Sequence, residues 1–377
     1  MSEFSAFDHE MMALAMQLAA RGRYGVSPNP MVGCVITNLQ RQIIGQGWHK
    51  KAGTGHAEVH ALAEAGDNAR GATVYVSLEP CSHFGRTPPC AEALIKAGVS
   101  RVVAAMQDPN PQVGGSGLAM LAAQGIQTQS GLLQTQAEQL NRGFIQRMRT
   151  GRPFVTVKLA ASLDGKTALQ NGQSQWITGP DAREDVQRHR AASCAILSGS
   201  GTVLADNPSL NVRPSPVLLA DMGQQPIRQP TRVIIDGRNQ LTPDLQLINL
   251  PGDVLIVNCQ PSEFEFSTNT RQWQAPLDAN NKLDLTAVMA YLGTQQLNNI
   301  WVEAGAKLAG ALIQQQLVDE LIVYLAPKLM GNHSQNLLNL PLFERMQDVV
   351  ELQWQDCRMV GADLKLTLKL TPSPITR

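Results

Sequence analysis

The sequence predicts an α/β protein with two domains. Its 377 residues exceed the usual size of one domain, so about two are expected. In the first half, β-branched runs such as 72–78 alternate with helical patterns such as 90–97, which is typical of a sheet covered by helices. Gly151-Arg152-Pro153 interrupts the chain, and the same alternation resumes after it. We therefore expect domains at 1–150 and 151–377.

The first domain is expected to contain a mixed sheet. Asp8 is the expected N-cap of a helix that ends near Gly22, because apolar residues recur at helical spacing between them. Strands at 32–36 and 42–47 are joined by a hairpin loop around Asn38. The other expected elements are helices at 56–65, 90–97, 118–124 and 137–149, and strands at 72–78, 101–106 and 126–128.

The second domain is expected to be an α/β unit of its own. Its predicted strands are 154–161, 195–198, 232–236, 254–258, 300–302 and 321–326, and its predicted helices are 180–190, 287–292 and 307–316. Gly199-Ser-Gly201 is expected to form a turn, and 214–230 and 260–282 to be polar connections. The region 352–370 is expected to contribute edge strands, because 363–368 alternates between polar and apolar residues.

Charge and composition disfavour several classes of partner. The chain has 31 basic and 31 acidic residues, so it has no bulk attraction to a polyanion. Six scattered cysteines are not a disulfide framework and suit a reducing compartment. The first residues lack the basic region of a signal peptide, and no apolar run approaches the roughly 18 residues of a membrane span. We expect a cytoplasmic protein without a nucleic-acid or membrane partner.

One histidine, two cysteines and one glutamate form the most informative pattern. His56 and Cys90 each begin a predicted helix, and Cys81 directly follows a predicted buried strand. Three such ligands with a fourth position for water are the usual catalytic zinc set. Glu58 lies two residues after the histidine, where it can take a proton from water at the zinc and deliver it to a leaving amine.

This pattern differs in one respect from a known signature. H-x-E followed by P-C-x-x-C marks zinc nucleobase deaminases, but here the eight residues 82–89 separate the two cysteines. The cysteines could instead be ordinary buried thiols, since a lone cysteine usually is one. The combination of H-A-E, P-C and a cysteine after Pro-Pro favours the metal site. His83 is a competing ligand in the inserted loop, and we expect it to face the substrate.

Several long motifs resemble one enzyme family. In the first half these are S-P-N-P-M-V-G-C-V at 27–35, H-A-E at 56–58 and E-P-C-S-H-F-G-R-T-P-P-C at 79–90. In the second half they are V-K-L-A-A-S-L-D-G-K at 157–166, G-T-V-L-A-D-N-P-S-L-N-V-R at 201–213 and V-D-E-L-I-V-Y-L-A-P-K-L-M-G at 318–331. Together they resemble the bifunctional riboflavin-biosynthesis deaminase/reductase over nearly the whole chain.

The resemblance implies both fold and activity. It implies a cytidine-deaminase-like three-layer α/β/α domain followed by a dihydrofolate-reductase-like α/β domain. The first would use zinc to remove the 2-amino group of 2,5-diamino-6-ribosylamino-4(3H)-pyrimidinone 5′-phosphate. The second would use NADPH to reduce the ribosyl group of 5-amino-6-(5-phosphoribosylamino)uracil to ribityl. A homo-oligomer, either dimer or tetramer, is also implied.

The resemblance also implies roles for individual residues. Zinc would be held by His56, Cys81 and Cys90, with Glu58 as the proton shuttle. The deaminase substrate would contact Asn29, His49, His83, Arg86, Asp108 and Asn110. NADPH would contact Ala160, Trp176, Thr202, Asp206, Gly237, Gly305, Ala306, Lys307, Leu308, Ala309, Gly310 and Ala311. The reductase substrate would contact Lys158, Ser174, Arg190, Leu210, Arg213 and Glu303, whose three cations suit a 5′-phosphate.

The cofactor site of the second domain is not a Rossmann site, since G-x-G-x-x-G is absent from the sequence. The amides of the helix that follows Glu303 are expected to hold the pyrophosphate of NADPH.

Two positions depart from the family. Ala304 stands where a glycine is frequent, and Gly237 stands where many relatives have a hydroxyl residue. Our hypothesis is that Arg238 helps to bind the 2′-phosphate of NADPH.

Two other functions remain open from the sequence alone. A zinc deaminase acting on tRNA or single-stranded nucleic acid, with an appended binding module, would share the first pattern. It would need a basic surface and exposed aromatics, whereas the net charge is zero and aromatics make up 5%. A zinc-stabilised metabolite-binding regulator would need no proton shuttle, so Glu58 argues against it. The two-step enzyme is the leading interpretation.

Overall fold

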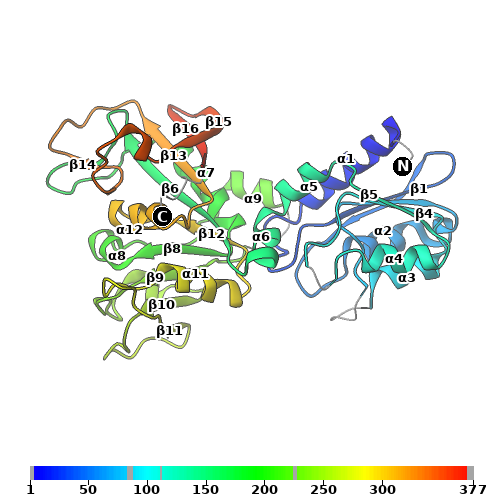
Figure 1. The fold of residues 1–377 in the computed structure, drawn as a ribbon, viewed down its shortest axis with the longest axis horizontal. Helices are drawn as coiled ribbons and strands as arrows, with labels where there is room; N and C mark the ends of the chain where they lie inside the picture. The colour runs from blue at the N-terminus through cyan, green and yellow to red at the C-terminus, as the bar shows by residue number, and fades with distance from the viewer. Residues whose placement is uncertain (1–3, 83–87, 111–112, 224–226, 372–377) are drawn as a thin grey trace. The chain divides into compact units, whose positions relative to one another are not determined.

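The chain forms two structural units in the computed structural model, which describes residues 4–82, 88–110, 113–223 and 227–371. The first unit is Met1–Gly151 and the second is Arg152–Arg377 (Figure 1). Among the described residues, every helix is too short or too polar to cross a membrane.

The first unit is built on a five-stranded mixed sheet with the order β2-β1-β3-β4-β5. Its strands are β1 (Gly33–Thr37), β2 (Ile43–Trp48), β3 (Thr73–Val76), β4 (Arg101–Ala104) and β5 (Gln127–Ser130). β1 pairs antiparallel with β2 and β3, while β3, β4 and β5 run parallel. The expected hairpin is confirmed, because Asn38 Oδ1 accepts the backbone N–H groups of Gln40 and Gln42 at 3.0 and 2.9 Å.

Helices cover both faces of this sheet. They are α1 (Ala6–Ala20), α2 (Ala57–Ala65), α3 (Cys90–Ala97), α4 (Ser116–Ala123), α5 (Gln134–Leu140) and α6 (Arg142–Thr150), with a 3₁₀ turn η1 (Gly66–Ala69) after α2. α2, α3 and α4 bury Ala61, Leu94 and Leu121 in one core. α1 and α5 bury Met12 and Ala137 in a second core on the opposite face (Figure 1). The expected three-layer α/β/α arrangement is therefore confirmed.

Two expectations for this unit are wrong. Ser5 caps α1 in place of Asp8: Ser5 Oγ accepts the Asp8 N–H at 3.2 Å, and Asp8 Oδ2 accepts the Ser5 N–H at 2.8 Å, which is a capping box. The single helix expected at 137–149 is two helices. Asn141 interrupts it with a φ of −108°, because its side chain bonds both the N–H and the C=O of Met31 at 2.8 Å.

The second unit is built on a nine-stranded sheet with the order β11-β10-β9-β8-β12-β6-β13-β16-β15. The strands from β11 to β13 in this order run parallel, and β16 and β15 are antiparallel additions. Their bounds are β6 (Phe154–Ser162), β8 (Ala195–Gly199), β9 (Thr231–Ile235), β10 (Val254–Asn258), β11 (Thr270–Gln274), β12 (Asn299–Val302), β13 (Glu320–Ala326), β15 (Leu352–Val360) and β16 (Asp363–Leu370). β7 (Lys166–Ala168) and β14 (Gln335–Asn336) form a separate two-stranded sheet.

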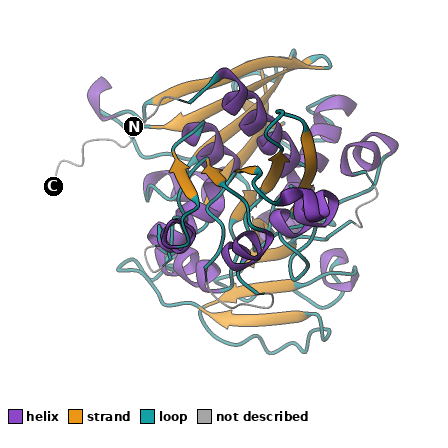
Figure 2. Ribbon diagram, turned by 90° about the vertical axis from the view of Figure 1, so that its right-hand side faces the viewer, coloured by secondary structure: helices purple, strands orange, loops and turns teal. Residues whose placement is uncertain are grey.

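The helices of the second unit also lie on both sides of its sheet (helices and strands are distinguished by colour in Figure 2). They are α7 (Pro180–Ala192), α8 (Ser200–Asp206), α9 (Pro216–Met222), α10 (Gln246–Asn249), α11 (Leu285–Thr294) and α12 (Ala306–Gln314), with a 3₁₀ turn η2 (Met346–Asp348). α11 and α12 bury Val288 and Leu312 in one core. α7, α8 and α10 bury Val186, Val203 and Ile248 in the other.

Four expectations for the second unit are wrong. Gly199–Gly201 is not a turn: Gly199 is the N-cap of α8, which the fully buried Val203 fixes to the core. The connection 214–230 contains α9, whose first turn is capped by Ser215 Oγ accepting the Leu218 N–H at 3.0 Å. The connection 260–282 contains β11, a polar strand held by parallel pairing with β10. β16 is an inner strand, and only β15 of this pair lies at the edge.

Candidate active sites

The three zinc ligands proposed from the sequence converge in the first unit. His56 is the N-cap of α2, Cys81 follows β3, and Cys90 is the first residue of α3. His56 Nδ1 lies 3.3 Å from Cys90 Sγ and 3.6 Å from Cys81 Sγ. A tetrahedral zinc with ordinary bond lengths separates a nitrogen and a sulfur ligand by about 3.5 Å. The donor set and its spacing therefore fit zinc.

The first turn of α3 fixes both sulfur atoms. The Cys90 N–H donates to Cys81 Sγ at 3.3 Å, and the Ala91 N–H donates to the Cys81 carbonyl at 3.1 Å. Both thiols thus lie at the N-terminus of a helix, where the helix dipole favours the thiolate form. Pro89 precedes the helix as its N-cap, so the Pro-Pro-Cys sequence sets the position of Cys90.

Glu58 lies in the first turn of α2, close in sequence to the ligand His56. Its side chain is buried, with 3% exposure, and Oε2 has no hydrogen-bond partner in the described part of the chain. Burial raises the pKa of Glu58 to about 7, and a bound cation would lower it again. A buried carboxylate with an unpaired oxygen is suited to accept and release protons.

Two predicted substrate residues lie beside the ligand His56. The ring of His49 packs edge-on against that of His56, with centroids 5.2 Å apart. His49 Nδ1 donates to the Gly55 carbonyl at 3.1 Å, so Nε2 accepts from Asn29 Nδ2 at 3.1 Å. Burial lowers the pKa of His49. The structure thus presents a neutral, buried imidazole next to the metal ligands.

The other predicted substrate residues of this unit lie in loops. Asp108 and Asn110 follow β4, and Asp108 Oδ1 accepts the Asn110 N–H at 2.8 Å. His83 and Arg86 lie outside the described residues. Sequence reasoning missed Glu79, a buried carboxylate next to Pro80-Cys81 that accepts four backbone N–H groups. Its place directly before Pro80-Cys81 was the available signal.

The second unit gathers charged side chains where the end of β12 lies beside the middle of β6. Val302 is in register with Val157, so the next residues, Glu303 and Lys158, are neighbours. Arg190 of α7 binds Glu303 with both edges of its guanidinium, from Nε to Oε1 at 2.6 Å and from Nη2 to Oε2 at 2.9 Å. Three groups that the sequence analysis assigned to the substrate are therefore in one cluster.

Electrostatics keep Glu303 ionised in this cluster. Burial alone would raise the pKa of Glu303, but Arg190, Lys158 and the Trp301 indole lower it to about 2. Arg190 Nη1 also donates to the Asn211 carbonyl at 2.9 Å. Three nitrogen atoms of the Arg190 guanidinium are thus bonded within the protein, and the main effect of Arg190 is to hold the Glu303 carboxylate.

Lys158 and Arg213 are the other two cations of this cluster, beside the Arg190 that binds Glu303. Burial lowers the pKa of Lys158, and Glu303 opposes that shift. Burial and the charge of Arg190 lower the pKa of Arg213. Because cations crowded in this way are stabilised by an anion, the arrangement suits a phosphate group.

The expected cofactor segment begins at the N-terminus of α12. Gly305 is its N-cap, and the Gly305 N–H donates to Thr202 Oγ1 at 3.1 Å. Gly305 and Lys307 are exposed, whereas Ala309 is fully buried. A Cβ on Gly310 would lie 2.1 Å from the Asn339 carbonyl oxygen. The first turn is therefore the accessible part of this segment, and its later residues pack inside the protein.

The other predicted residues of this unit are spread over five places. Ala160 is in β6, Asp206 ends α8, and Ser174, Leu210 and Gly237 lie in connections. Trp176 is 63% exposed, with the Arg183 guanidinium 4.7 Å from its ring. Leu210 is buried with a positive φ of 43°. A Cβ on Gly237 would contact Leu283 at 3.3 Å, so a larger residue there would need Leu283 to shift.

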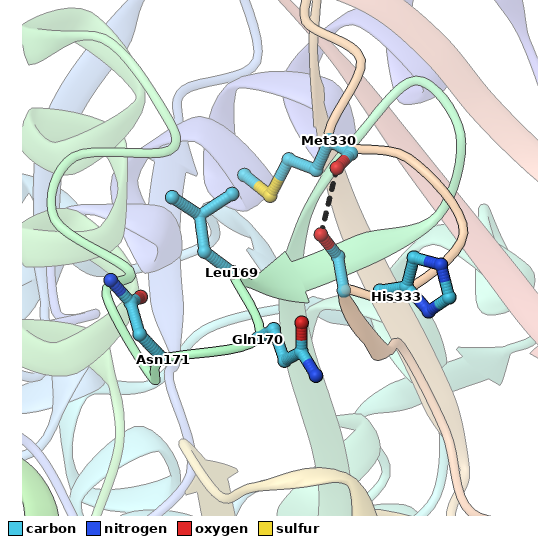
Figure 3. Close-up of a pocket in the computed structure, with 6 residues that line it drawn as sticks. Leu169, Gln170, Asn171, Met330 and His333 are labelled. Atoms are coloured by element: carbon cyan, nitrogen blue, oxygen red, sulfur yellow. Dashed lines mark hydrogen bonds between the residues drawn. The ribbon is translucent and has the colours of Figure 1, made fainter.

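An open hollow lies near β7 (Figure 3). It is lined by Leu169, Gln170, Asn171, Met330, His333 and Ser334, and Ser334 Oγ donates to the Met330 carbonyl at 2.8 Å. The lining has no carboxylate, lysine or arginine. None of these residues is among the predicted site residues.

A buried network beside Trp301 was also missed from the sequence. Lys365 Nζ donates to Asp185 Oδ2 at 2.6 Å and to His189 Nε2 at 2.7 Å. Tyr324 Oη donates to the same Asp185 oxygen at 2.6 Å. The His189 ring stacks on Trp301 with centroids 4.6 Å apart, and Trp301 Nε1 donates to Glu303 Oε1 at 2.9 Å. From the sequence, only the contact between His189 and Asp185 could have been expected, because the two residues are one helical turn apart on α7.

Family models match both halves of the chain. Residues 5–106 match the cytidine and deoxycytidylate deaminase zinc-binding region, and residues 153–366 match the RibD C-terminal domain. The zinc-binding match contains His56, Glu58, Cys81 and Cys90, the residues that the structure brings together.

Full-length relatives agree with these matches. The chain is 52% identical to riboflavin biosynthesis protein RibD of Escherichia coli, covering 96% of this chain and 99% of that protein. It is 49% identical to the RibD protein of Haemophilus influenzae, with coverage of 97% and 98%. A solved structure of Acinetobacter baumannii RibD superposes with a TM-score of 0.88 at 40% identity, covering 97% of this chain and 99% of that one. The chain therefore belongs to the RibD family of bifunctional riboflavin-biosynthesis enzymes, which join a zinc-dependent deaminase to an NADPH-dependent reductase.

Proposed function

We propose that residues 1–150 deaminate 2,5-diamino-6-ribosylamino-4(3H)-pyrimidinone 5′-phosphate and that residues 151–377 reduce 5-amino-6-(5-phosphoribosylamino)uracil with NADPH. A Thermotoga maritima relative, 29% identical with a TM-score of 0.85 over 97% of this chain and 99% of that one, is described as the deaminase and reductase of these compounds. The observation that carries the proposal is the pairing of the His56, Cys81 and Cys90 cluster with the buried Glu58. We further expect a cytoplasmic homo-oligomer.

The deaminase residues divide into three roles. A zinc ion held by His56, Cys81 and Cys90 would lower the pKa of water at the site. Glu58 accepts a proton at Oε2 and delivers it to the departing amine, because this oxygen is buried and has no hydrogen-bond partner among the described residues. His49 orients the pyrimidine as a neutral imidazole. Asn29, His83, Arg86, Asp108 and Asn110 are the further contacts proposed for the phosphorylated pyrimidine.

The reductase residues bind and orient rather than react. NADPH, when bound, would supply the hydride. In the first turn of α12 the Gly305 N–H donates to Thr202, and the next backbone N–H groups, those of Ala306 and Lys307, are offered to the pyrophosphate. Lys158 and Arg213 are the proposed partners of the 5′-phosphate. Arg190 binds Glu303 through two bonds, which supports Glu303 as the proposed contact to the sugar. Ser174 and Leu210 complete the proposed substrate contacts. Ala160, Trp176, Thr202, Asp206, Gly237, Leu308, Ala309, Gly310 and Ala311 complete those for NADPH.

The nucleic-acid alternative is disfavoured by the second half of the chain. A deaminase with an appended binding module would not need a domain that matches the RibD C-terminal domain over residues 153–366. The balanced charge, with 31 basic and 31 acidic residues, also provides no general attraction to a polyanion.

Glu58→Gln tests the deaminase mechanism. Glutamine keeps the shape of the side chain but cannot carry the proton, so ammonia release should fall by roughly 10²- to 10⁴-fold. Zinc content and NADPH oxidation on the uracil substrate should be unchanged. Glu64→Gln is the matched control, because Glu64 is an exposed carboxylate of the same helix. Near wild-type deamination by Glu58→Gln would exclude the proposed proton transfer.

A further inference from the structure

Glu79 links the metal ligand Cys81 to a remote loop of the first unit. It lies between the end of β3 and Pro80-Cys81 and is 4% exposed. Its backbone N–H donates to the Met106 carbonyl at 3.0 Å. Backbone and side chain therefore both face the segment that follows β4.

The carboxylate of Glu79 accepts four backbone N–H groups from that segment. Oε2 accepts from Asp108 at 2.9 Å and from Gly115 at 2.8 Å. Oε1 accepts from Gly117 at 2.8 Å and from Leu118 at 3.2 Å. Gly115 is the N-cap of α4, which has no side-chain cap of its own. Glu79 therefore caps this helix from another element, and its charge also complements the helix dipole.

Two glycines show independently that the backbone is tightly packed where α4 and the loop before it meet Pro80-Cys81. A Cβ on Gly117 would lie 1.9 Å from the Pro80 carbonyl oxygen, so α4 meets the Pro80-Cys81 backbone directly. A Cβ on Gly114 would lie 2.7 Å from the Asp108 carbonyl oxygen. A side chain at Gly117 would therefore push α4 away from Pro80, and one at Gly114 would open the loop itself at Asp108.

The loop fixed in this way carries two of the proposed substrate contacts. Asp108 Oδ1 accepts the Asn110 N–H at 2.8 Å. The Asn110 carbonyl accepts the N–H groups of Val113 and Gly114, both at 2.9 Å. Glu79 bonds the loop on both sides of this turn, at Asp108 and at Gly115.

We propose that Glu79 is a positioning residue of the deaminase, which sets the Asp108–Asn110 loop against Cys81 so that the pyrimidine binds within reach of the metal ligands. This inference rests on the proposed contact of Asp108 and Asn110 with the substrate. Glu79 itself does not touch the reacting atoms. Its loss should weaken substrate binding more than the chemical step.

Glu79→Gln is the decisive variant. The amide keeps one acceptor oxygen but turns an NH₂ group towards two N–H donors, so half of the bonds are lost in a side chain of nearly the same shape. We expect the deaminase KM to rise about tenfold or more while kcat changes by less than about threefold. Zinc content should be unchanged, and the reductase kcat/KM measured with added uracil substrate should match the wild type. Glu64→Gln, which alters a carboxylate that accepts one exposed N–H from Gln46, is the control.

Two results would overturn the proposal. One is a KM that stays within about twofold of the wild type. The other is joint loss of zinc and kcat, which would make Glu79 a structural support of the metal site. If Glu79→Gln does not yield folded protein, Gly117→Ala answers the same question with Glu79 intact. It should raise KM with zinc retained, and an unchanged KM would reject the idea.

Asn110→Ala separates this inference from the function on which it rests. If Asn110→Ala raises the deaminase KM and Glu79→Gln does not, the substrate contact stands and the role of Glu79 is rejected. If Glu58→Gln still releases ammonia at the wild-type rate, the proposed deaminase mechanism fails whatever the Glu79 variant shows.

Discussion

Glu303 shows how single residues of the second unit depend on one another. It accepts two bonds from Arg190 and one from the Trp301 indole. Breaking a buried ion pair by removing one partner costs about 3–5 kcal/mol, because the remaining charge is uncompensated. Lys158 and Arg190 would also repel each other without the carboxylate. The residue proposed to bind the sugar is therefore also needed for the local fold.

The stability of the protein should depend on pH through Glu303. Its pKa is lowered from 4.5 to about 2 in the folded protein. Because this pKa is lower in the folded protein than in the unfolded one, the ionised Glu303 contributes fully to the free energy of unfolding above pH 4.5. That contribution is lost as the pH falls towards 2. This contribution is about 3 kcal/mol. We expect the free energy of unfolding of Glu303→Gln to be lower than that of the wild type by a similar amount at pH 7. The difference between the two proteins should shrink as the pH falls from 4.5 towards 2.

Urea unfolding at several pH values measures this effect. Glu263→Gln is a suitable control, because Glu263 is exposed in the same unit. A difference in the free energy of unfolding between Glu303→Gln and wild type that does not change between neutral and acidic pH would contradict the assignment of Glu303 as the ionised partner.

The sequence could identify site residues only where the pattern is local. His56 and Glu58 are two residues apart, and Cys81 and Cys90 flank a distinctive insertion. Glu79 adjoins Pro80-Cys81, but its role could not be read from that position because its partners, like those of Lys365, are remote in sequence. Lys365 occupies a polar position of an alternating strand, which indicates solvent, yet it is 2% exposed because it pairs with Asp185.

At the scale of elements, the break between α5 and α6 is set by one side chain. Asn141 is 4% exposed and bonds the N–H and the C=O of Met31, each at 2.8 Å. Met31 belongs to the segment that also carries Asn29, one of the proposed substrate contacts. The interruption of the helix thus fixes a loop of the deaminase site.

Asn141→Ala should therefore destabilise the first unit rather than extend the helix. It removes the Asn141 partner from two backbone groups of the half-buried Met31, and a group left unpaired costs about 1–3 kcal/mol where it is fully buried. We expect a lower free energy of unfolding for the first unit, measured by thermal or urea denaturation. Asn280→Ala, at an exposed position, should cost little. Equal stability of Asn141→Ala and wild type would show that the break has another cause.

Elements were predictable where their own residues determine them. α3 begins at Cys90 and ends at Ala97 as expected, because Pro-Pro precedes it and Gly98 adopts the left-handed conformation after it. β11 was not predictable, since all residues of Thr270–Gln274 except Trp273 are polar, and the strand is held by pairing with β10 and by the packing of Trp273 against the core. α8 begins at a Gly-Ser-Gly sequence, which predicts a turn. The segment is a helix instead, because the helical conformation buries Val203 in the core.

At the scale of the whole molecule, the two-domain α/β class followed from length and alternation, but the strand orders did not. In the nine-stranded sheet, β6 lies between β12 and β13, which are more than a hundred residues later in the chain. Such neighbours are chosen by packing between distant segments. Each unit has its own pair of cores, Ala61 and Met12 marking the first and Val288 and Val186 the second.

Because each proposed site uses residues of one unit, each ligand should stabilise one unit. Zinc would bind His56, Cys81 and Cys90 in the first unit, and NADPH would bind at α12 in the second. A ligand at a hundred times its Kd adds about 2.7 kcal/mol. For a unit of about 150–250 residues this amounts to roughly 5–10 °C in the Tm.

Calorimetry of the full chain measures these shifts. The unfolding transition that Asn141→Ala lowers is assigned to the first unit, and the transition that Glu303→Gln lowers is assigned to the second. A zinc chelator should lower the first transition and stop ammonia release. It should leave the second transition, and NADPH oxidation on added uracil substrate, unchanged. If chelation also stopped the reduction of added substrate, the two reactions would share the metal, and the assignment of one cofactor to each unit would be wrong.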